Sequence, residues 1–91
     1  MERRVREKLR EELQALRPVL LTEPSHRYVD LFDEFIEHHE FGLALETVCD
    51  YILEPASPRV SESIIDLIQR LHSSMEMSDE CVVMLRNQKL A

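Results

Sequence analysis

The chain has 91 residues, of which 44% are hydrophobic, and a formal net charge of −7. This length suits a single domain with one modest core, and the apolar share excludes a disordered chain. No apolar run approaches the roughly 20 residues of a bilayer-spanning helix, and the mixed-charge N-terminus does not resemble a secretory signal. We therefore expect one domain, residues 1–91, that stays in the cytoplasm and does not bind membranes.

The charge is unevenly distributed along the chain. Residues 1–17 carry six basic and four acidic side chains, a net of +2. Residues 18–91 carry five basic and fourteen acidic side chains, a net of −9. Because an acidic body repels phosphate backbones, this distribution argues against direct nucleic-acid binding and favours a positively charged protein partner.

The first 20 residues show the periodicity of an amphipathic helix. Apolar side chains recur at intervals of three and four: Val5, Leu9, Leu13, Leu16 and Leu20. Since proline cannot continue a helix, we expect this helix to cover residues 3–17 and to end next to Pro18.

Two further helices are predicted, and the earlier of them, the second helix of the chain, should stop around His39–Glu40, near Gly42, the only glycine in the chain. The second covers residues 23–39, with Thr22 and Pro24 at its entry. It should bury a stripe of four apolar residues, namely Tyr28, Leu31, Phe32 and Phe35. The third covers residues 41–53 and carries six apolar residues on one face: Phe41, Ala44, Leu45, Val48, Cys49 and Ile52.

Two prolines, Pro55 and Pro58, exclude a helix in the segment that follows. A fourth helix is predicted over residues 61–74 with Ser61 as its N-cap, and a fifth over residues 78–87 with Ser78 as its N-cap. Each cap is flanked by an apolar pair that can form a hydrophobic staple, Val60 with Ile65 and Met77 with Val82. Since no segment shows strand alternation, the expected fold is all-α, a small bundle of four to five helices.

The chain lacks the signatures of metal binding and catalysis. Cys49 and Cys81 form neither a CxxC pair nor a zinc spacing, so we expect two free, buried thiols in a reducing cytosol. The adjacent His38 and His39 point about 100° apart on a helix, which does not suit two ligands of one metal. Glycine-rich loops and activated nucleophiles are also missing from the pattern. We therefore expect no enzymatic activity, no cofactor and no metal.

Acidic side chains cluster between residues 30 and 54, where no lysine or arginine occurs. Four of them occupy positions i, i+3, i+4 and i+7 of the second helix: Asp30, Asp33, Glu34 and Glu37. Their like-charge spacings cost that helix about 1–2 kcal/mol in total. The remaining four lie between the helices or recur every four residues in the third: Glu40, Glu46, Asp50 and Glu54.

Three interpretations of these acids are open: a solvated face, internal pairing with the arginines of the first helix, or a partner-binding surface. Solubility alone does not require charges of one sign to cluster. If the surface binds a partner, Leu43 and Tyr51 are the candidate anchors, because helical projection places Leu43 among the acids and Tyr51 at their edge. Alternatively, Leu43 covers the turn after Gly42.

One segment resembles the MafI-type immunity proteins of bacterial polymorphic toxin systems, which are close to some contact-dependent growth inhibition immunity proteins. The matching residues are Glu40, Phe41, Leu43, Ala44, Leu45, Glu46, Thr47, Cys49 and Asp50, followed by Val60 and Ser61. The resemblance covers roughly residues 33–80. It implies a small helical protein of the cytoplasm that binds and blocks a cognate toxin domain, often a basic nuclease.

On this interpretation the toxin-binding residues are the eight acids and the two candidate anchors: Asp30, Asp33, Glu34, Glu37, Glu40, Leu43, Glu46, Asp50, Tyr51 and Glu54. Two alternatives remain from other functional classes. One is a small helical adaptor or regulatory protein that self-associates through its first helix. The other is an enzyme or metal protein whose site is assembled from scattered residues.

Overall fold

Six helices, joined by short turns, make up the part of the chain that the computed structural model describes, residues 2–55, 57 and 59–89. They are α1 (Arg3–Gln14), α2 (Arg17–Leu20), α3 (Arg27–Glu37), α4 (Phe41–Ile52), α5 (Glu62–Ser74) and α6 (Glu80–Lys89). Five of them have 10 to 13 residues, and α2 is a single turn. Those described residues form no strand, which confirms the predicted all-α fold.

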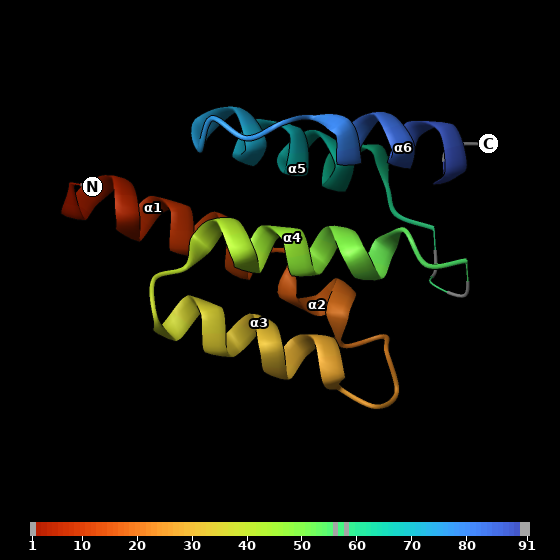
Figure 1. The fold of residues 1–91 in the computed structure, drawn as a ribbon, viewed down its shortest axis with the longest axis horizontal. Coiled ribbons are helices and arrows are strands. Elements are labelled where there is room, and N and C mark those ends of the chain that lie inside the picture. Colours follow the sequence, from red (N-terminus) through yellow and green to blue (C-terminus); the bar gives the residue numbers. More distant parts are fainter. Residues whose placement is uncertain (1, 56, 58, 90–91) are drawn as a thin grey trace.

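The helices form two layers around α4. In Figure 1, α6, α4 and α3 lie nearer the viewer, and α5, α1 and α2 lie behind them. The molecule measures 38 × 27 × 18 Å, so its thickness is close to two helix diameters. Helix α4 contacts α1, α2, α3 and α5, and eight of its twelve residues are buried. None of the described helices has the length and apolar character required to cross a bilayer.

The first helix ends earlier than predicted. Helix α1 stops at Gln14, and a turn leads to α2, in which Pro18 occupies the first turn. Proline suits that position because a first-turn residue needs no N–H donor, so Pro18 begins a helix here instead of ending one. The apolar periodicity is retained, since Leu16 and Leu20 are both fully buried.

The predicted start of the second helix at residue 23 is wrong, because α3 begins at Arg27. The Glu23 carboxylate accepts hydrogen bonds from the backbone N–H groups of Ser25 (2.7 Å) and Arg27 (3.1 Å) and from the Ser25 hydroxyl. These bonds favour the charged carboxylate and lower the pKa of Glu23, with the Ser25 hydroxyl as the largest cause. Residues 23–26 therefore form a capping turn that precedes the helix.

The buried stripe of α3 also differs from the prediction. Val29, Phe32 and Ile36 are its buried residues, whereas Leu31 is 42% exposed. The other two predicted members, Tyr28 and Phe35, are partly buried against the core. The stripe is rotated because α2 and α4 both pack against α3 and together select the face that it buries.

Helix α3 ends in a Schellman motif that does not use glycine. The Glu40 N–H donates to the Phe35 carbonyl (2.8 Å), and the His39 N–H donates to the Ile36 carbonyl (3.1 Å). His39 adopts a φ of 57°, a left-handed conformation that is costly for a residue with a Cβ. Helix α5 ends in the same way, with Glu76 at a φ of 55°.

Of the two predicted N-caps, the one of α5 is confirmed, whereas the one of α6 lies outside its helix. Ser61 is the N-cap of α5, as predicted, and its side chain accepts a hydrogen bond from the Ile64 N–H at 3.3 Å. Helix α6 begins at Glu80, two residues later than predicted. The Ser78 hydroxyl still accepts a hydrogen bond from the Glu80 N–H at 3.3 Å, so it binds a free donor of the first turn from just outside the helix.

The prediction of two free thiols is wrong, because Cys49 and Cys81 form a disulfide that joins α4 to the first turn of α6. Their Cα atoms are 6.3 Å apart, within the usual range for a disulfide. A separation of 32 residues gives no local spacing signal, and only the packing of α6 beside α4 brings the two cysteines together.

We expect Leu45→Ala to lower the free energy of unfolding by about 2–5 kcal/mol, because Leu45 is fully buried in α4 and its truncation leaves a cavity. Leu43→Ala is the matched control on the same helix, since Leu43 is exposed, and it should cost less than about 0.5 kcal/mol. Urea unfolding followed by circular dichroism measures both values. Equal losses in the two variants would contradict the assigned buried face.

Removal of the disulfide in the double variant Cys49→Ala/Cys81→Ser should lower the free energy of unfolding by about 3–4 kcal/mol, because the crosslink restricts the unfolded chain over a long loop. Urea unfolding without reductant measures the loss. The wild-type protein, fully reduced with dithiothreitol, is the control and should lose a similar amount. A loss below about 1 kcal/mol in both samples would show that the crosslink does not stabilise the fold.

Candidate protein-binding face

Six of the eight predicted acids remain exposed on α3, on the α3–α4 turn and on α4. We call these six residues the acidic face: Asp30, Glu34, Glu37, Glu40, Glu46 and Asp50. None of their carboxylates forms an ion pair with a residue that the structure describes. The cost of placing like charges on neighbouring turns is therefore not offset by an ion pair, although Asp30 lies close enough to Arg17 to help raise the pKa of that guanidinium.

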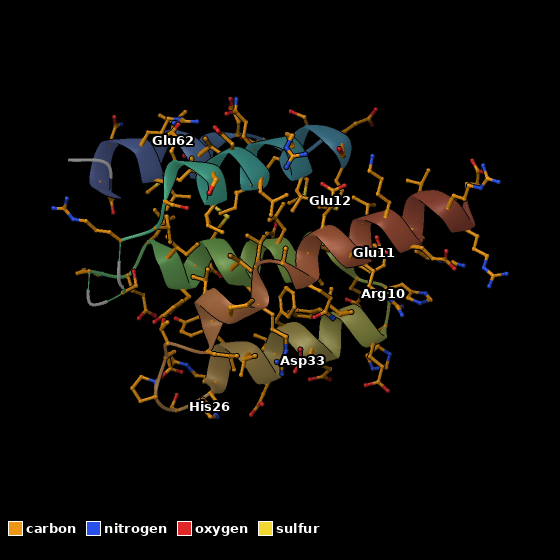
Figure 2. All side chains as sticks on the ribbon, turned by 180° about the vertical axis from the view of Figure 1, so that it is seen from behind. Arg10, Glu11, Glu12, His26, Asp33 and Glu62 are labelled. Atoms are coloured by element: carbon orange, nitrogen blue, oxygen red, sulfur yellow. A yellow bond between two sulfur atoms is a disulfide. The ribbon has the colours of Figure 1, made fainter. Side chains whose placement is uncertain are left out.

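Asp33 is separated from the acidic face by an internal ion pair. Asp33 lies on α3 (Figure 2), and its two carboxylate oxygens accept hydrogen bonds from the Arg17 guanidinium of α2 at 2.9 and 2.8 Å. These bonds raise the pKa of Arg17 above its ordinary value. Both side chains are close to 40% exposed, so solvent screens the pair and its contribution to stability is small. Of the three interpretations of the acids, internal pairing with an arginine of the predicted first helix (residues 3–17) is therefore the one that applies to Asp33.

Glu54 is likewise engaged within the chain. It accepts a hydrogen bond from the Tyr28 hydroxyl, and its carboxylate lies 3.7 Å from the Arg27 guanidinium. Arg27 also lies over the Tyr28 ring, 4.8 Å from its centroid. These contacts join the start of α3 to the end of α4, so Glu54 closes the open end of this helical hairpin.

The prediction that Tyr51 lies at an exposed edge is wrong. Tyr51 is only 5% exposed, and its hydroxyl shares a 2.6 Å hydrogen bond with the Thr22 hydroxyl. Its ring packs against Tyr28 with centroids 5.2 Å apart. Helical projection missed this burial because it describes one helix alone, whereas α3 and the segment after α2 cover Tyr51 from the side.

Exposed apolar residues near the acids include Leu43 and Leu31, each 42% exposed, and Met84 of α6, which is 39% exposed and lines a pocket with Glu46 and Asp50. The predicted exposure of Leu43 among the acids is confirmed. Together with Glu40 and Met77 it lines a hollow of about 560 Å³ between the α3–α4 turn and the α5–α6 turn. Leu31 was expected in the core, so the sequence gave no indication that it belongs to this surface.

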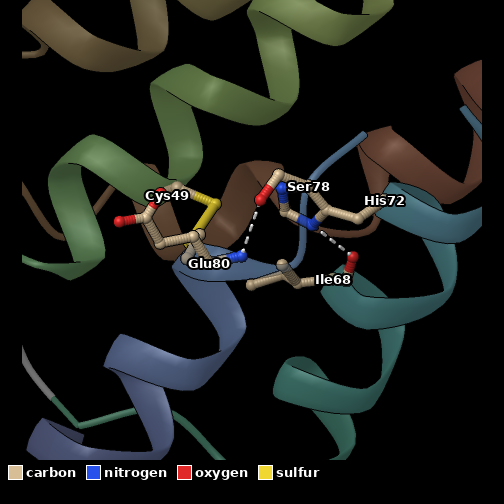
Figure 3. Close-up of a disulfide and its surroundings, with 6 residues drawn as sticks. Cys49, Ile68, His72, Ser78 and Glu80 are labelled. Carbon is tan, nitrogen blue, oxygen red and sulfur yellow. Dashed lines mark hydrogen bonds between the residues drawn. A yellow bond between two sulfur atoms is a disulfide. The ribbon is translucent and has the colours of Figure 1, made fainter. Parts of the chain in front are cut away.

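Glu46 and Asp50 lie along a groove of about 430 Å³ between α4 and the start of α6, which we call the α4–α6 groove. It contains a third carboxylate, Glu80, and both cysteines of the disulfide also line it (Figure 3). Sequence reasoning missed Glu80 because an acidic residue in the first turn of a helix is already explained by the helix dipole.

The histidines do not form a metal site. His38 and His39 are exposed at the end of α3. His72 is buried, and its Nδ1 atom donates a hydrogen bond to the Ile68 carbonyl oxygen at 2.8 Å (Figure 3). Within residues 2–55, 57 and 59–89, no three His, Cys, Asp or Glu side chains are arranged to hold a metal ion.

No protein-family model, curated protein or solved structure matches this chain. The resemblance to immunity proteins therefore depends on the motif residues alone, and any functional conclusion has to come from the exposed surface.

The Tyr28–Glu54 contact predicts a specific pH dependence. The hydrogen bond to Glu54 is the main cause that raises the pKa of Tyr28 above its ordinary value of 10.0, and burial adds to it. Because the pKa is raised in the folded state, the associated stability is present below the ordinary pKa and is lost as the pH rises through the folded pKa. Tyr28→Phe should therefore show a smaller alkaline loss of unfolding free energy than the wild-type protein.

Urea unfolding over a pH series tests this expectation. The difference in tyrosinate absorbance between the wild-type protein and Tyr28→Phe reports the Tyr28 pKa, because Tyr51 also absorbs. In Glu54→Gln, the pKa of Tyr28 should return towards its ordinary value. An unchanged alkaline transition in both variants would contradict the assigned role of this hydrogen bond.

Proposed function

We propose that this protein is an immunity protein of the cytoplasm that binds a cognate toxin domain through its acidic face and blocks it without catalysis. The observation that carries the proposal is the set of six exposed carboxylates, none of which forms an ion pair with a residue that the structure describes. A basic partner would supply the missing positive charge and would be attracted over long range.

The charge of the face indicates the kind of toxin. A nuclease has to be basic in order to hold RNA or DNA, so its substrate-binding surface is complementary to clustered carboxylates. The assignment to toxin immunity comes from the resemblance in residues 40–50 and at Val60 and Ser61. On this proposal the protein either fills the active-site cleft of the toxin or covers its substrate-binding surface.

The exposed leucines replace Tyr51 as the candidate anchors. Interfaces commonly place apolar side chains at the centre and charged ones at the rim. Leu43 meets this description because it is exposed on α4 and lies on the same outward side as Glu46 and Asp50. Leu31 offers a second apolar contact on α3.

The geometry of α1 supports this proposal over self-association through the first helix. Leu9 and Leu13 are buried within the same chain, and only Val5 of the apolar stripe of α1 remains exposed, at 48%. A single exposed valine leaves little apolar surface for a second copy, because a stable interface needs roughly 800 Å² from each partner.

Binding to the toxin domain encoded by the neighbouring reading frame provides the test. The double variant Glu37→Lys/Asp50→Lys should slow association about tenfold or more at low salt and flatten its salt dependence, because the rim charges steer encounter. Leu43→Ala should mainly speed dissociation, with a loss of about 1–2 kcal/mol for a partly exposed leucine that becomes buried. Stopped-flow mixing and surface-binding measurements separate the two effects.

Two matched controls lie outside the face. Glu11→Lys on α1 changes a single exposed acid, and Leu21→Ala truncates a leucine that is 45% exposed. Both should bind and protect cells as the wild-type protein does. Unchanged binding after charge reversal would show that the acidic face is only solvated, and turnover of a nucleotide, ester or peptide by the protein alone would exclude a purely inhibitory role.

A further inference from the structure

The two cysteines of the Cys49–Cys81 disulfide differ in exposure. Cys49 is buried on α4, whereas Cys81 is half-buried in the first turn of α6, and both line the α4–α6 groove (Figure 3). Because Cys81 is the more exposed of the two residues, we expect a small reagent that enters this groove to attack the sulfur of Cys81. Access to a sulfur atom is one of the factors that set the rate of thiol–disulfide exchange.

The groove carries a strong negative charge. Glu46, Asp50 and Glu80 line it, and among the described residues no lysine or arginine does. The N-terminus of α6 adds a partial positive charge of roughly +0.5, which is small beside three full negative charges. The His72 side chain is buried and held by its hydrogen bond to the Ile68 carbonyl, so we do not count it as a positive charge that offsets the three carboxylates.

We propose that this disulfide is a thiol–disulfide exchange site that selects its reactant by charge. Cationic thiols react readily through the α4–α6 groove, and anionic thiols are repelled from it. The inference is independent of the proposed immunity function, because it uses only the disulfide and the carboxylates around it.

The reaction proceeds in two displacements. A thiolate attacks the Cys81 sulfur, a new sulfur–sulfur bond forms, and the Cys49–Cys81 bond breaks with its electron pair on the Cys49 sulfur, which then takes a proton from water. A second thiolate attacks the reagent sulfur of the mixed disulfide and releases Cys81 as a thiolate. Two thiols are oxidised to one small disulfide, and the protein disulfide is reduced to two thiols.

Two sulfur atoms carry negative charge in the first displacement, that of the attacking thiolate and that of the departing Cys49, and the same carboxylates repel both. The incoming thiolate has to approach Glu80 and Asp50, and the departing Cys49 sulfur acquires its charge on a buried face of α4, next to Asp50 in the sequence. Glutathione is a doubly negative species as a thiolate, so it is a poor reactant at this site. The disulfide is therefore protected kinetically in a pool of anionic thiols, although reduction can still be favourable at equilibrium.

A panel of three small thiols tests the proposal: cysteamine (cationic), 2-mercaptoethanol (neutral) and mercaptoacetate (anionic). The rate of mixed-disulfide formation is measured by acid quench and mass spectrometry, and it is expressed per thiolate. Each rate is divided by the rate of the same thiol with bis(2-hydroxyethyl) disulfide, which removes differences in intrinsic nucleophilicity. At low salt the normalised rate should fall roughly tenfold at each step of the panel, since each carboxylate contributes roughly a two- to threefold effect. In 1 M salt the three values should converge within about twofold.

Matched variants distinguish the effect of the groove carboxylates on the exchange rate from the effect of the net charge of the protein. Asp50→Asn/Glu80→Gln should reduce the spread between cysteamine and mercaptoacetate several-fold, whereas Glu11→Gln on α1 should leave it unchanged. Peptide mapping should place the reagent on Cys81. Equal normalised rates at low salt would overturn the proposal, because they would indicate exchange through the unfolded chain. A spread that persists in the groove variant, or reagent attached first to Cys49, would overturn it as well.

Discussion

The burial of α4 is the constraint on which the rest of this structure depends. An apolar surface that covers most of a helix has to be enclosed by several neighbours, and α1, α2, α3 and α5 all contact it. This enclosure leaves only a narrow strip of α4 in contact with solvent, which includes Leu43, Glu46 and Asp50. The strip borders the α4–α6 groove on one side and the hairpin with α3 on the other. The candidate binding surface is thus the part of the core helix that the bundle does not cover.

The arrangement of charge follows from the same packing. Acids at the margins of the α3–α4 hairpin meet arginines of the same chain, as Asp33 meets Arg17 and Glu54 meets Arg27. The residues of the acidic face form no such ion pair, although Arg3, Arg6 and Arg10 of α1 lie near the α3–α4 turn, where they line a pocket with His39. Like charges therefore remain exposed on α3, on the α3–α4 turn and on α4, where they add to the negative field that a basic partner would meet.

Helix α6 is attached to the bundle in a different way from the other helices. Its buried residues are Val82 and Leu85, while Val83 and Met84 remain exposed. Arg86 compensates in part through contacts with Glu62, Asp66 and Gln69 of α5, but these partners are solvent-exposed and contribute little individually. The disulfide attaches α6 to α4 covalently, in addition to the small apolar surface that α6 buries against the bundle.

The sequence by itself determined the helical class, the buried face of α4 and the cap at Ser61, because each depends on local periodicity or on a side chain that binds its own helix terminus. It also determined the acidic character of residues 30–54 and the exposure of Leu43. Only the tertiary structure decided that Tyr51 is covered, that Leu31 is exposed and that Asp33 is paired, because those outcomes depend on which neighbours pack beside a helix. The tertiary structure also decided the disulfide and the position of Glu80 in the α4–α6 groove. Both bring together segments more than 25 residues apart in the chain, and no local pattern specifies that contact.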